Sequence, residues 1–333
     1  MLIAAALLVP AGAPVPAAAQ AGAAVPMQEW TVPWEKSRPR DPAVDAQGRI
    51  FFVGQVGNYV ARLDPRTGDF EKFAIDAGTM PHNVVVDRRG FAWYSGNMNG
   101  MIGRLDPATG AITRYPMPDA NVKDPHTLAF DPAGDIWFTA QNSNVVGKLT
   151  VSSGKVQLLA LERPRSRPYG IVIDPHGRPW FCLFGTNRIG TVDPATMQVT
   201  EIAGPDSMYR PRRIAMTSDG RVWTVDYMRG MLVAYDPRTK QWKEWASPLG
   251  KASLPYAMTV DDRDRLWWVE TGKQPNRLVG FDPATQQMLG ATEVKSGGGT
   301  IRHMVFDRAT GVIWFGTDNN TIGKAVVSPK PIS

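Results

Sequence analysis

The chain has 333 residues, a formal net charge of +6, 43% hydrophobic residues and a single cysteine. This hydrophobic content is sufficient for a large core, and no run of lysine and arginine is long enough to suggest a nucleic-acid partner. One cysteine excludes an internal disulfide framework, so we expect a buried, inert thiol at Cys182.

Residues 1–19 are predicted to form a secretory signal peptide. The segment is apolar and alanine-rich, and it ends in a small-residue site at Ala17, Ala18 and Ala19. It is too short for a membrane span and is interrupted by three prolines. We therefore expect export to the periplasm or secretion, and no membrane span in the mature protein.

Residues 27–327 are predicted to form one domain built from seven repeats. The clearest repeat runs from Asp124 to Leu161 and contains four short apolar runs separated by turns. Corresponding positions along the chain are separated by 42, 44, 43, 43, 44 and 46 residues. A period in the forties with four strands per unit is typical of a β-propeller blade.

Three columns of residues fix the register of the repeats. The first lies five positions before the Asp or Thr that ends the first run, and it holds Arg40, His82, His126, Tyr169, Arg212, Tyr256 and Arg302. The second is aromatic and holds Phe51, Trp93, Trp137, Trp180, Trp223, Trp267 and Trp314. The third is an Asp-Pro turn, as at Asp106-Pro107, in which proline presets the backbone and aspartate caps it. We predict that the aromatic column packs between blades.

The two ends of the domain are predicted to complete each other. The segment Met27–Trp34 resembles the fourth run of a repeat, such as Ala111–Met117, whereas the last repeat passes directly into a tail at residues 328–333. We therefore predict an all-β fold, a seven-bladed β-propeller of four-stranded blades, closed by the N-terminal strand completing the last blade. Such closure removes the free sheet edges that promote aggregation.

One mouth of the central channel is predicted to collect the polar residues. In a propeller, the loop into the innermost strand and the loop leaving the second strand open on the same face. The first column therefore faces a second set, which holds Gly54-Gln55, Gly96-Asn97, Ala140-Gln141, Leu183-Phe184, Asp226-Tyr227, Glu270-Thr271 and Thr317-Asp318. Carboxylates beside Arg and Tyr could supply a general base, a metal ligand and an oxyanion stabiliser there. His176 falls in a turn on the opposite side.

A purely structural interpretation competes with this one. Propeller channels collect ion pairs because buried charges need partners, so most single residues in these columns are explained by channel filling. Glu270 is the strongest functional candidate, because it is a lone carboxylate that follows two tryptophans at the end of a strand.

The repeat resembles that of the virginiamycin B lyase (streptogramin lyase) family. Segments that carry the resemblance are Pro125–Leu128, Asp135–Thr139 and Val146–Lys148, and the likeness extends from about Met27 to Val327. It implies a monomeric seven-bladed propeller that opens a cyclic depsipeptide antibiotic, and so confers antibiotic resistance. Members of the family use Mg2+ and eliminate across the ester bond without water.

The family's functional positions can be transferred residue by residue. They are two histidines in the first column of consecutive blades and a glutamate fourteen residues after the second. Glu270 matches the glutamate, whereas the histidine positions fall on Arg212 and Tyr256. A further acid of the family falls on Leu254. The consecutive pair His82 and His126 is followed at fourteen residues by Gly96 and Ala140, so it has no glutamate.

From these observations we expect an eliminase that acts on a small cyclic ester or related carbonyl compound. The expected catalytic residues are Glu270, Tyr256, Arg212 and His126, with Tyr256 or His126 as proton carrier and Arg212 polarising a carbonyl. Mg2+ is expected on Glu270 and Asp226. The expected substrate contacts are Arg40, His82, Tyr169, Arg302, His303 and Tyr227.

Two alternative functions remain open at this point. One is a lactone hydrolase of the gluconolactonase or regucalcin kind, for which Asp226, Glu270 and Asp318 could contribute to a divalent-metal site. The other is an exported propeller that binds an anionic ligand or a partner protein without chemistry, since fold does not imply function.

Overall fold

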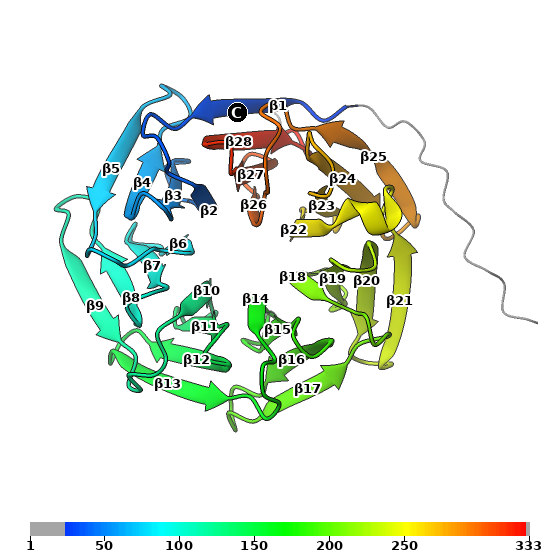
Figure 1. The fold of residues 1–333 in the computed structure, drawn as a ribbon, viewed down its shortest axis with the longest axis horizontal. Coiled ribbons are helices and arrows are strands. Elements are labelled where there is room, and N and C mark those ends of the chain that lie inside the picture. The colour runs from blue at the N-terminus through cyan, green and yellow to red at the C-terminus, as the bar shows by residue number, and fades with distance from the viewer. Residues whose placement is uncertain (1–23, 331–333) are drawn as a thin grey trace, which may run out of the picture.

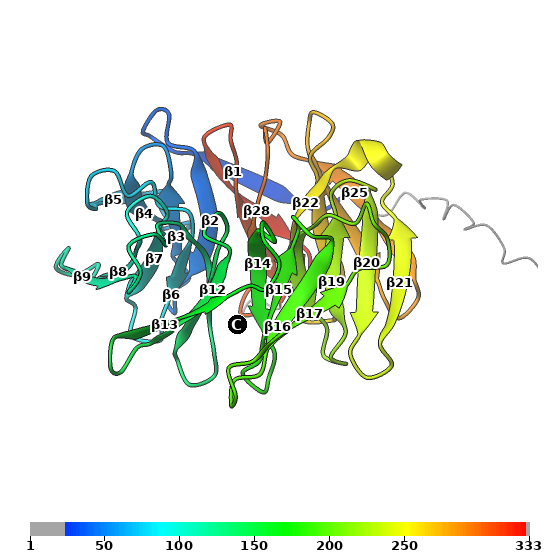
Figure 2. The same cartoon turned by 60° about the horizontal axis from the view of Figure 1, so that its bottom comes forward.

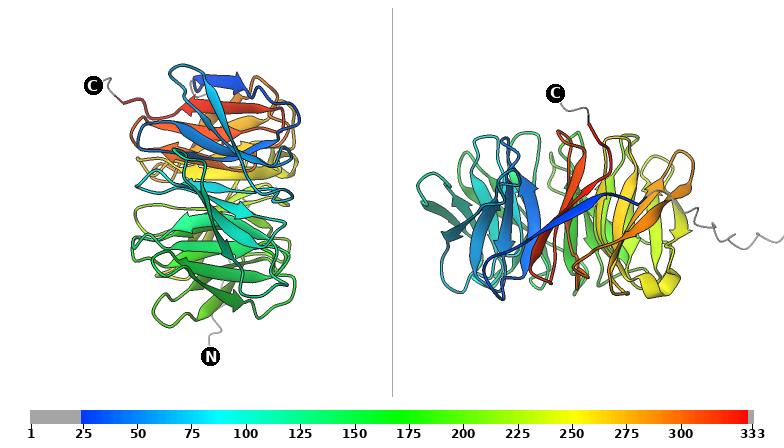
Figure 3. Two further views of the ribbon diagram at one scale, coloured as in Figure 1. Left: turned by 90° about the vertical axis from the view of Figure 1, so that its left-hand side faces the viewer. Right: turned by 90° about the horizontal axis from the view of Figure 1, so that it is seen from above.

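The chain folds as a ring of seven antiparallel sheets, each of four strands, around a central channel (Figure 1). The structure is a computed structural model that describes residues 24–330, so the predicted signal at residues 1–19 lies outside the described residues. Seen from the side, the ring is a thick disc (Figure 3). The predicted all-β, seven-bladed propeller is confirmed.

Each blade contributes one strand to each of four concentric rings. The innermost strands are β2 (Pro39–Val44), β6 (Val84–Val86), β10 (Pro125–Phe130), β14 (Pro168–Ile173), β18 (Pro211–Met216), β22 (Pro255–Val260) and β26 (Met304–Asp307). The second ring is β3 (Ile50–Gly54), β7 (Ala92–Gly96), β11 (Ile136–Ala140), β15 (Pro179–Leu183), β19 (Val222–Asp226), β23 (Leu266–Glu270) and β27 (Val312–Gly316). The third ring is β4 (Tyr59–Leu63), β8 (Met101–Leu105), β12 (Val145–Thr150), β16 (Arg188–Val192), β20 (Met231–Asp236), β24 (Arg277–Asp282) and β28 (Thr321–Val326). The outer strands are β5 (Phe70–Ala74), β9 (Ile112–Pro116), β13 (Lys155–Ala160), β17 (Val199–Ala203), β21 (Gln241–Ala246), β25 (Gln287–Glu293) and β1 (Met27–Thr31).

The last blade takes its outer strand from the other end of the chain. β1 pairs antiparallel with β28, from Met27 opposite Ala325 to Thr31 opposite Thr321, and the two strands lie side by side in Figure 1. This pairing joins the two ends of the domain by backbone hydrogen bonds and leaves the seventh blade with a full set of strands.

The aromatic column is buried throughout, which confirms its predicted role in the core. In four blades the indole N–H of this aromatic residue donates a hydrogen bond to the residue that ends the innermost strand. This bond fixes the position of the aromatic ring relative to that strand. The pairs are Trp93–Asp87 (2.9 Å), Trp180–Asp174 (3.5 Å), Trp223–Thr217 (2.9 Å) and Trp267–Asp261 (2.9 Å). The other oxygen of the aspartate caps the following turn, as at Asp87, which accepts from the backbone N–H of Arg89 at 2.9 Å and of Phe91 at 3.0 Å.

The innermost strands start irregularly, and this irregularity positions the channel residues. In five blades the pairing with the second strand shifts just after the strand begins, for example between Arg40 and Ala43. A bulge of this kind redirects side chains. In three of these blades the residue after the first-column residue, Asp41, Thr127 or Arg213, forms a side-chain hydrogen bond with another blade across the channel.

Over residues 24–330, no helix is long and apolar enough to cross a membrane. The single helix in this range is the short 3-10 turn η1 (Gly250–Ser253), which stands at the rim of the ring at the top of Figure 2. We call this end of the channel, where the innermost strands begin, the upper end. Cys182 is buried as predicted, and burial raises the pKa of its thiol.

Candidate functional site

The upper channel brings together two tyrosine hydroxyls beside an arginine. The hydroxyl oxygens of Tyr169 and Tyr256 are 2.5 Å apart, and Arg212 Nη1 lies 3.5 Å from the Tyr256 oxygen. The His126 ring packs against Tyr169 with 4.2 Å between ring centroids, and His82 packs on His126 at 3.4 Å. The predicted convergence of first-column residues from different blades is therefore present.

Arg212 is surrounded by aromatic rings. Its guanidinium carbon lies 4.5 Å from the Tyr227 ring centroid, 4.7 Å from that of Phe184, 5.1 Å from that of Tyr256 and 5.9 Å from that of Tyr169. Cation–π contacts with four rings hold the guanidinium in place while its charge stays available for hydrogen bonding. Sequence analysis placed Tyr227 at this site but did not select Phe184.

Two further arginines of the first column face the same end of the channel. Arg40 donates from Nη1 to Gln55 Oε1 at 3.0 Å, whereas its Nε and Nη2 are buried without a hydrogen-bond partner among the described residues. Arg302 forms an ion pair with Asp318, which Arg38 also reaches at 3.3 Å. The predicted substrate residues Arg40 and Arg302 thus give this end a positive charge.

A second polar layer lies directly below the first. Arg213 donates from Nε to the carbonyl of Arg302 (2.7 Å) and from Nη2 to Asp41 Oδ2 (3.1 Å). Its Nη1 donates to Thr127 Oγ1 at 3.3 Å, and Asn83 donates to the same Asp41 oxygen at 3.2 Å. This hub joins five blades through side chains. Sequence analysis missed Asp41 and Arg213, although each directly follows a first-column arginine.

The tyrosine pair is polarised by its surroundings. Burial alone would raise the pKa of Tyr169, but the charges of Arg213 and Arg40, with the hydrogen bond from Tyr256, lower it below its ordinary value. Burial and the neighbouring Tyr169 raise the pKa of Tyr256. Tyr256 therefore keeps its proton and donates to the Tyr169 oxygen, so that Tyr169 is the better proton acceptor.

The three channel histidines are neutral. Burial, with the charge of Arg40, holds the pKa of His82 well below its usual range, and burial with Arg213 does the same for His126. Burial and Arg213 lower the pKa of His303 to about 4. Burial alone would raise the pKa of Asp41, but the charges of Arg213 and Arg40 outweigh it and hold this pKa well below its usual range, so the carboxylate is charged.

These histidines predict that stability falls as the pH drops from 7 to 4. An unfolded histidine takes up a proton near pH 6.5, whereas folded His303 resists protonation down to about pH 4 and burial holds the pKa of His82 and His126 well below the usual range. The unfolded state therefore binds more protons in this window. We expect the melting temperature to decrease across it. His303→Gln should flatten part of this slope, and His176→Gln, in an exposed turn, should leave it unchanged. Equal slopes in both variants would contradict the assignment.

Glu270 and Asp226 lie at the upper end of the blades, but their carboxylates are fully buried and are occupied by hydrogen bonds and ion pairs with neighbouring groups. Glu270 Oε1 accepts from Ser247 Oγ (2.7 Å) and the backbone N–H of Leu249 (2.9 Å), and Oε2 accepts from Arg277 Nε (3.0 Å). Asp226 accepts from three backbone N–H groups of its own blade and from Arg229 Nε at 2.5 Å.

The expected role of Glu270 as a base beside Tyr256 needs correction for this reason. Successive side chains of a strand point to opposite faces. In two of these pairs the second member, Tyr227 or Gln55, contacts the first column. The first members Asp226 and Glu270 are instead buried and bonded to groups outside that column.

Glu270→Gln is therefore expected to reduce stability more than it changes chemistry. The substitution leaves the largely buried Arg277, whose side chain is 19% exposed, without its charge partner. We expect the free energy of unfolding to fall by about 3 kcal/mol, measured by urea denaturation. Glu293→Gln, which removes an exposed contact with Lys273, is the matched control and should cost less than about 1 kcal/mol. Loss of turnover by fully folded Glu270→Gln protein would contradict this role.

The side chains of the upper channel do not provide suitable ligands for Mg2+. This ion takes carboxylate and water oxygens in octahedral geometry. The Asp226 and Glu270 carboxylates are occupied by internal hydrogen bonds, and Asp318 is paired with two arginines. Within residues 24–330, no group of three or more His, Cys, Asp or Glu side chains is placed to hold a metal ion. The cationic charge here comes instead from guanidinium groups.

Comparisons with known proteins agree on the fold. A sequence model of the Virginiamycin B lyase family matches residues 19–234, more than half of the chain. Among curated proteins, none matches the sequence. A solved structure of selenomethionine-substituted virginiamycin B lyase from Staphylococcus aureus is 21% identical and has a TM-score of 0.82, with 91% of this chain and 100% of that chain covered.

Two further solved structures are similar to the same degree. A streptogramin B lyase is 23% identical, with a TM-score of 0.83 over 92% of this chain and 99% of that chain. A catalytically inactive variant of the Staphylococcus aureus enzyme, solved with quinupristin, is 22% identical, with a TM-score of 0.82 over 91% of this chain and 100% of that chain. At these identities the likeness shows a shared fold.

Proposed function

Because the chain belongs to the virginiamycin B lyase family, we propose that it is an eliminase that opens a cyclic ester or depsipeptide, or a related carbonyl compound, at the upper end of the channel. The observation that carries this proposal is the Tyr169–Tyr256 hydroxyl pair, 2.5 Å apart, beside Arg212. Removing a proton beside a carbonyl group requires a proton acceptor and a positive charge near the carbonyl oxygen. Tyr169, whose pKa is lowered, is the proton acceptor, and Arg212 is the positive charge.

The chemistry needs no water. The Tyr169 oxygen takes the proton from the carbon next to the substrate carbonyl, and Arg212 stabilises the negative charge that develops on the carbonyl oxygen. The electron pair forms a double bond to the neighbouring carbon, whose bond to the ester oxygen breaks. The acyl side leaves as a carboxylate, which Arg40 and Arg302 can receive, since two Arg40 nitrogens lack hydrogen-bond partners among the described residues.

His126 is the second candidate for the proton carrier. Its imidazole is neutral because burial and Arg213 lower its pKa, and it packs against Tyr169 with ring centroids 4.2 Å apart. Its Nδ1 is engaged with Thr127 Oγ1 at 2.9 Å. His82 stacks on the other side of His126 and fixes the ring.

No step of this chemistry uses Mg2+, because guanidinium groups supply the positive charge. We further propose a small-molecule substrate, a monomeric protein and export to the periplasm or the outside of the cell, the last from the apolar, alanine-rich N-terminal sequence. The staphylococcal lyase structure with quinupristin supports the choice of a cyclic depsipeptide as the first substrate to test.

Product analysis tests the proposal directly. Purified protein is incubated with quinupristin in EDTA, and the products are separated and weighed by mass spectrometry. Elimination opens the ring without changing its mass and leaves a dehydro residue. A gain of one water would indicate a lactone hydrolase instead. Quinupristin that binds but is not consumed, with or without added Mg2+, would favour an exported binding propeller.

A further inference from the structure

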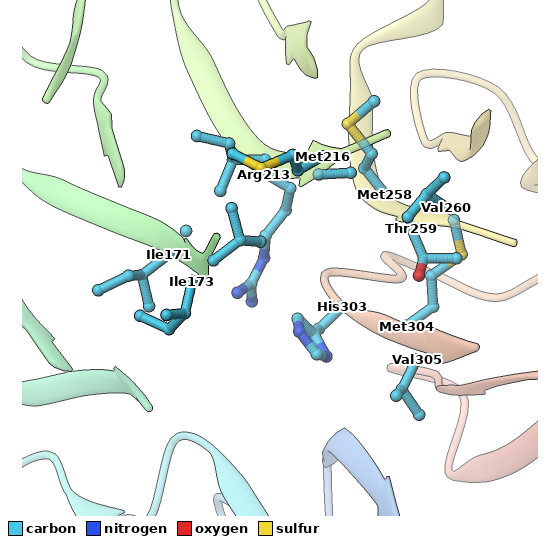
Figure 4. Close-up of a pocket in the computed structure, with 14 residues that line it drawn as sticks. Ile171, Ile173, Arg213, Met216, Met258, Thr259, Val260, His303, Met304 and Val305 are labelled. Atoms are coloured by element: carbon cyan, nitrogen blue, oxygen red, sulfur yellow. The ribbon is translucent and has the colours of Figure 1, made fainter. Parts of the chain in front are cut away.

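The lower half of the channel contains a cavity that the chemistry proposed above does not use. It has a volume of about 300 Å³ and lies between the innermost strands β14, β18, β22 and β26 (Figure 4). The residues that line it are mostly apolar and include Ile171, Ile173, Met216, Met258, Val260 and Met304, and Ile171, Met258 and Met304 are also buried in the core clusters between blades. A concave apolar site of this size, with few polar groups, has the character of a small-molecule pocket.

The cavity ends at two polar side chains. Figure 4 shows Arg213, on β18, and His303, just before β26, pointing toward the middle of the channel. The hydrogen bonds of Arg213 to Arg302, Thr127 and Asp41 account for three of its five N–H groups. His303 Nδ1 is buried and has no hydrogen-bond partner among the described residues. The closed end therefore offers hydrogen-bonding capacity in an apolar surrounding.

The charged cluster around Arg213, directly above the cavity, carries a net positive charge. Asp41 is shared by two guanidinium groups, with Arg213 Nη2 at 3.1 Å and Arg40 Nε at 3.7 Å. The Asp41 Oδ1 oxygen accepts no hydrogen bond. The single negative charge of Asp41 balances only one of the two positive charges of Arg213 and Arg40. Burying an unbalanced cation is costly, and a ligand carboxylate would offset that cost.

The cavity continues into an opening at the lower face. Ile173 and Met216 also line a wider hollow of about 640 Å³ between the turns of five blades. Four aspartates at this rim are bonded to neighbours: Asp131 to Lys148, Asp174 to backbone N–H groups, Asp262 to Lys330 and Asp264 to Ser218. A ligand can therefore enter from this face and reach Arg213 past apolar walls.

We propose that the lower channel binds an apolar monocarboxylate, with its carboxylate at Arg213 and His303 and its hydrocarbon tail along the Ile, Val and Met walls. The pocket opens below the tyrosine pair and meets it at Arg213, whose guanidinium carbon lies 5.1 Å from the Tyr169 ring centroid. A ligand held there contacts strands β14, β18, β22 and β26, which also carry Tyr169, Arg212 and Tyr256 at their upper ends.

Titration calorimetry with the full-length protein tests this site. Octanoate is expected to bind, and octan-1-ol, which has the same tail without the charge, is expected to bind about tenfold more weakly. Met216→Trp should abolish octanoate binding by filling the channel, whereas Met216→Leu should preserve it. His303→Leu should weaken octanoate and leave octan-1-ol unchanged, with circular dichroism showing that each variant is folded.

Three results would overturn the proposal. Equal affinity for octanoate and octan-1-ol would show that the closed end does not recognise the carboxylate. Tighter binding of octylamine would show that the rim aspartates dominate. Octanoate binding that survives in folded Met216→Trp protein would place the ligand outside this channel. None of these results depends on turnover at the upper end.

Discussion

Tyr169→Phe is expected to reduce kcat for ester opening by about 10²–10⁴-fold, the usual contribution of a positioned general base. The phenol oxygen is the proton acceptor because Arg213 and Arg40 lower its pKa while Tyr256 donates to it. Phenylalanine keeps the ring contacts with His126 and Phe184, so the fold and the position of Arg212 should be preserved. The rate is measured on quinupristin or on another cyclic ester that the protein consumes.

Two companion variants separate the hydroxyl from the ring. Tyr227→Phe is the matched control, since its ring also packs on Arg212, and it should retain most of the activity. Tyr256→Phe removes the hydrogen bond that helps to lower the pKa of Tyr169. Because activity rises as Tyr169 loses its proton, the rising limb of the pH profile should move to higher pH. Wild-type turnover by Tyr169→Phe would assign the base elsewhere, and His126→Asn would be the next variant.

The architecture could be predicted because each repeat carries the same local chemistry. The aspartate that ends an innermost strand both caps the next turn and accepts the indole N–H of the aromatic column, as Asp87 does for Phe91 and Trp93. These contacts span at most six residues, so they appear in the sequence as fixed spacings. Seven copies then determine the circular arrangement.

The direction of single side chains could not be predicted in the same way. The backbone of Glu270 lies where the fourteen-residue spacing places it, opposite Pro255 at the upper end of β23. Its side chain is buried away from the first column because Ser247, which follows β21 of the preceding blade, and Arg277, on β24, supply hydrogen-bond donors there. Those partners lie 23 and seven residues away and follow no repeat pattern.

Contacts across the channel are the hardest to read from a sequence. Arg213 and Asp41 are separated by 172 residues and belong to blades on different sides of the ring. Their pairing has no counterpart in the other blades. Comparing the repeats finds features that the blades share, so it could not find this pair. Only the curvature of the whole ring brings the two side chains together.

Removing either partner of this pair is expected to give the largest loss of stability. Asp41→Asn leaves Arg213 without its carboxylate, and Arg213→Met leaves the buried Asp41 with only the more distant Arg40, whose Nε lies 3.7 Å away. Each substitution should therefore lower the free energy of unfolding by about 3–5 kcal/mol. Asparagine is the suitable replacement because Asp41 has φ 45°, in the left-handed region that asparagine tolerates. Urea denaturation measures the change.

The double variant distinguishes a charge pair from simple loss of packing. Asp41→Asn with Arg213→Met removes both charges, so it should cost less than the sum of the single variants, by about 1–3 kcal/mol. Asp64→Asn, in an exposed pair whose Arg66 side chain is 76% exposed, should cost less than about 1 kcal/mol. Strictly additive losses would mean that Arg213 is held by its other contacts, to Arg302 and Thr127, and that the hub does not depend on charge.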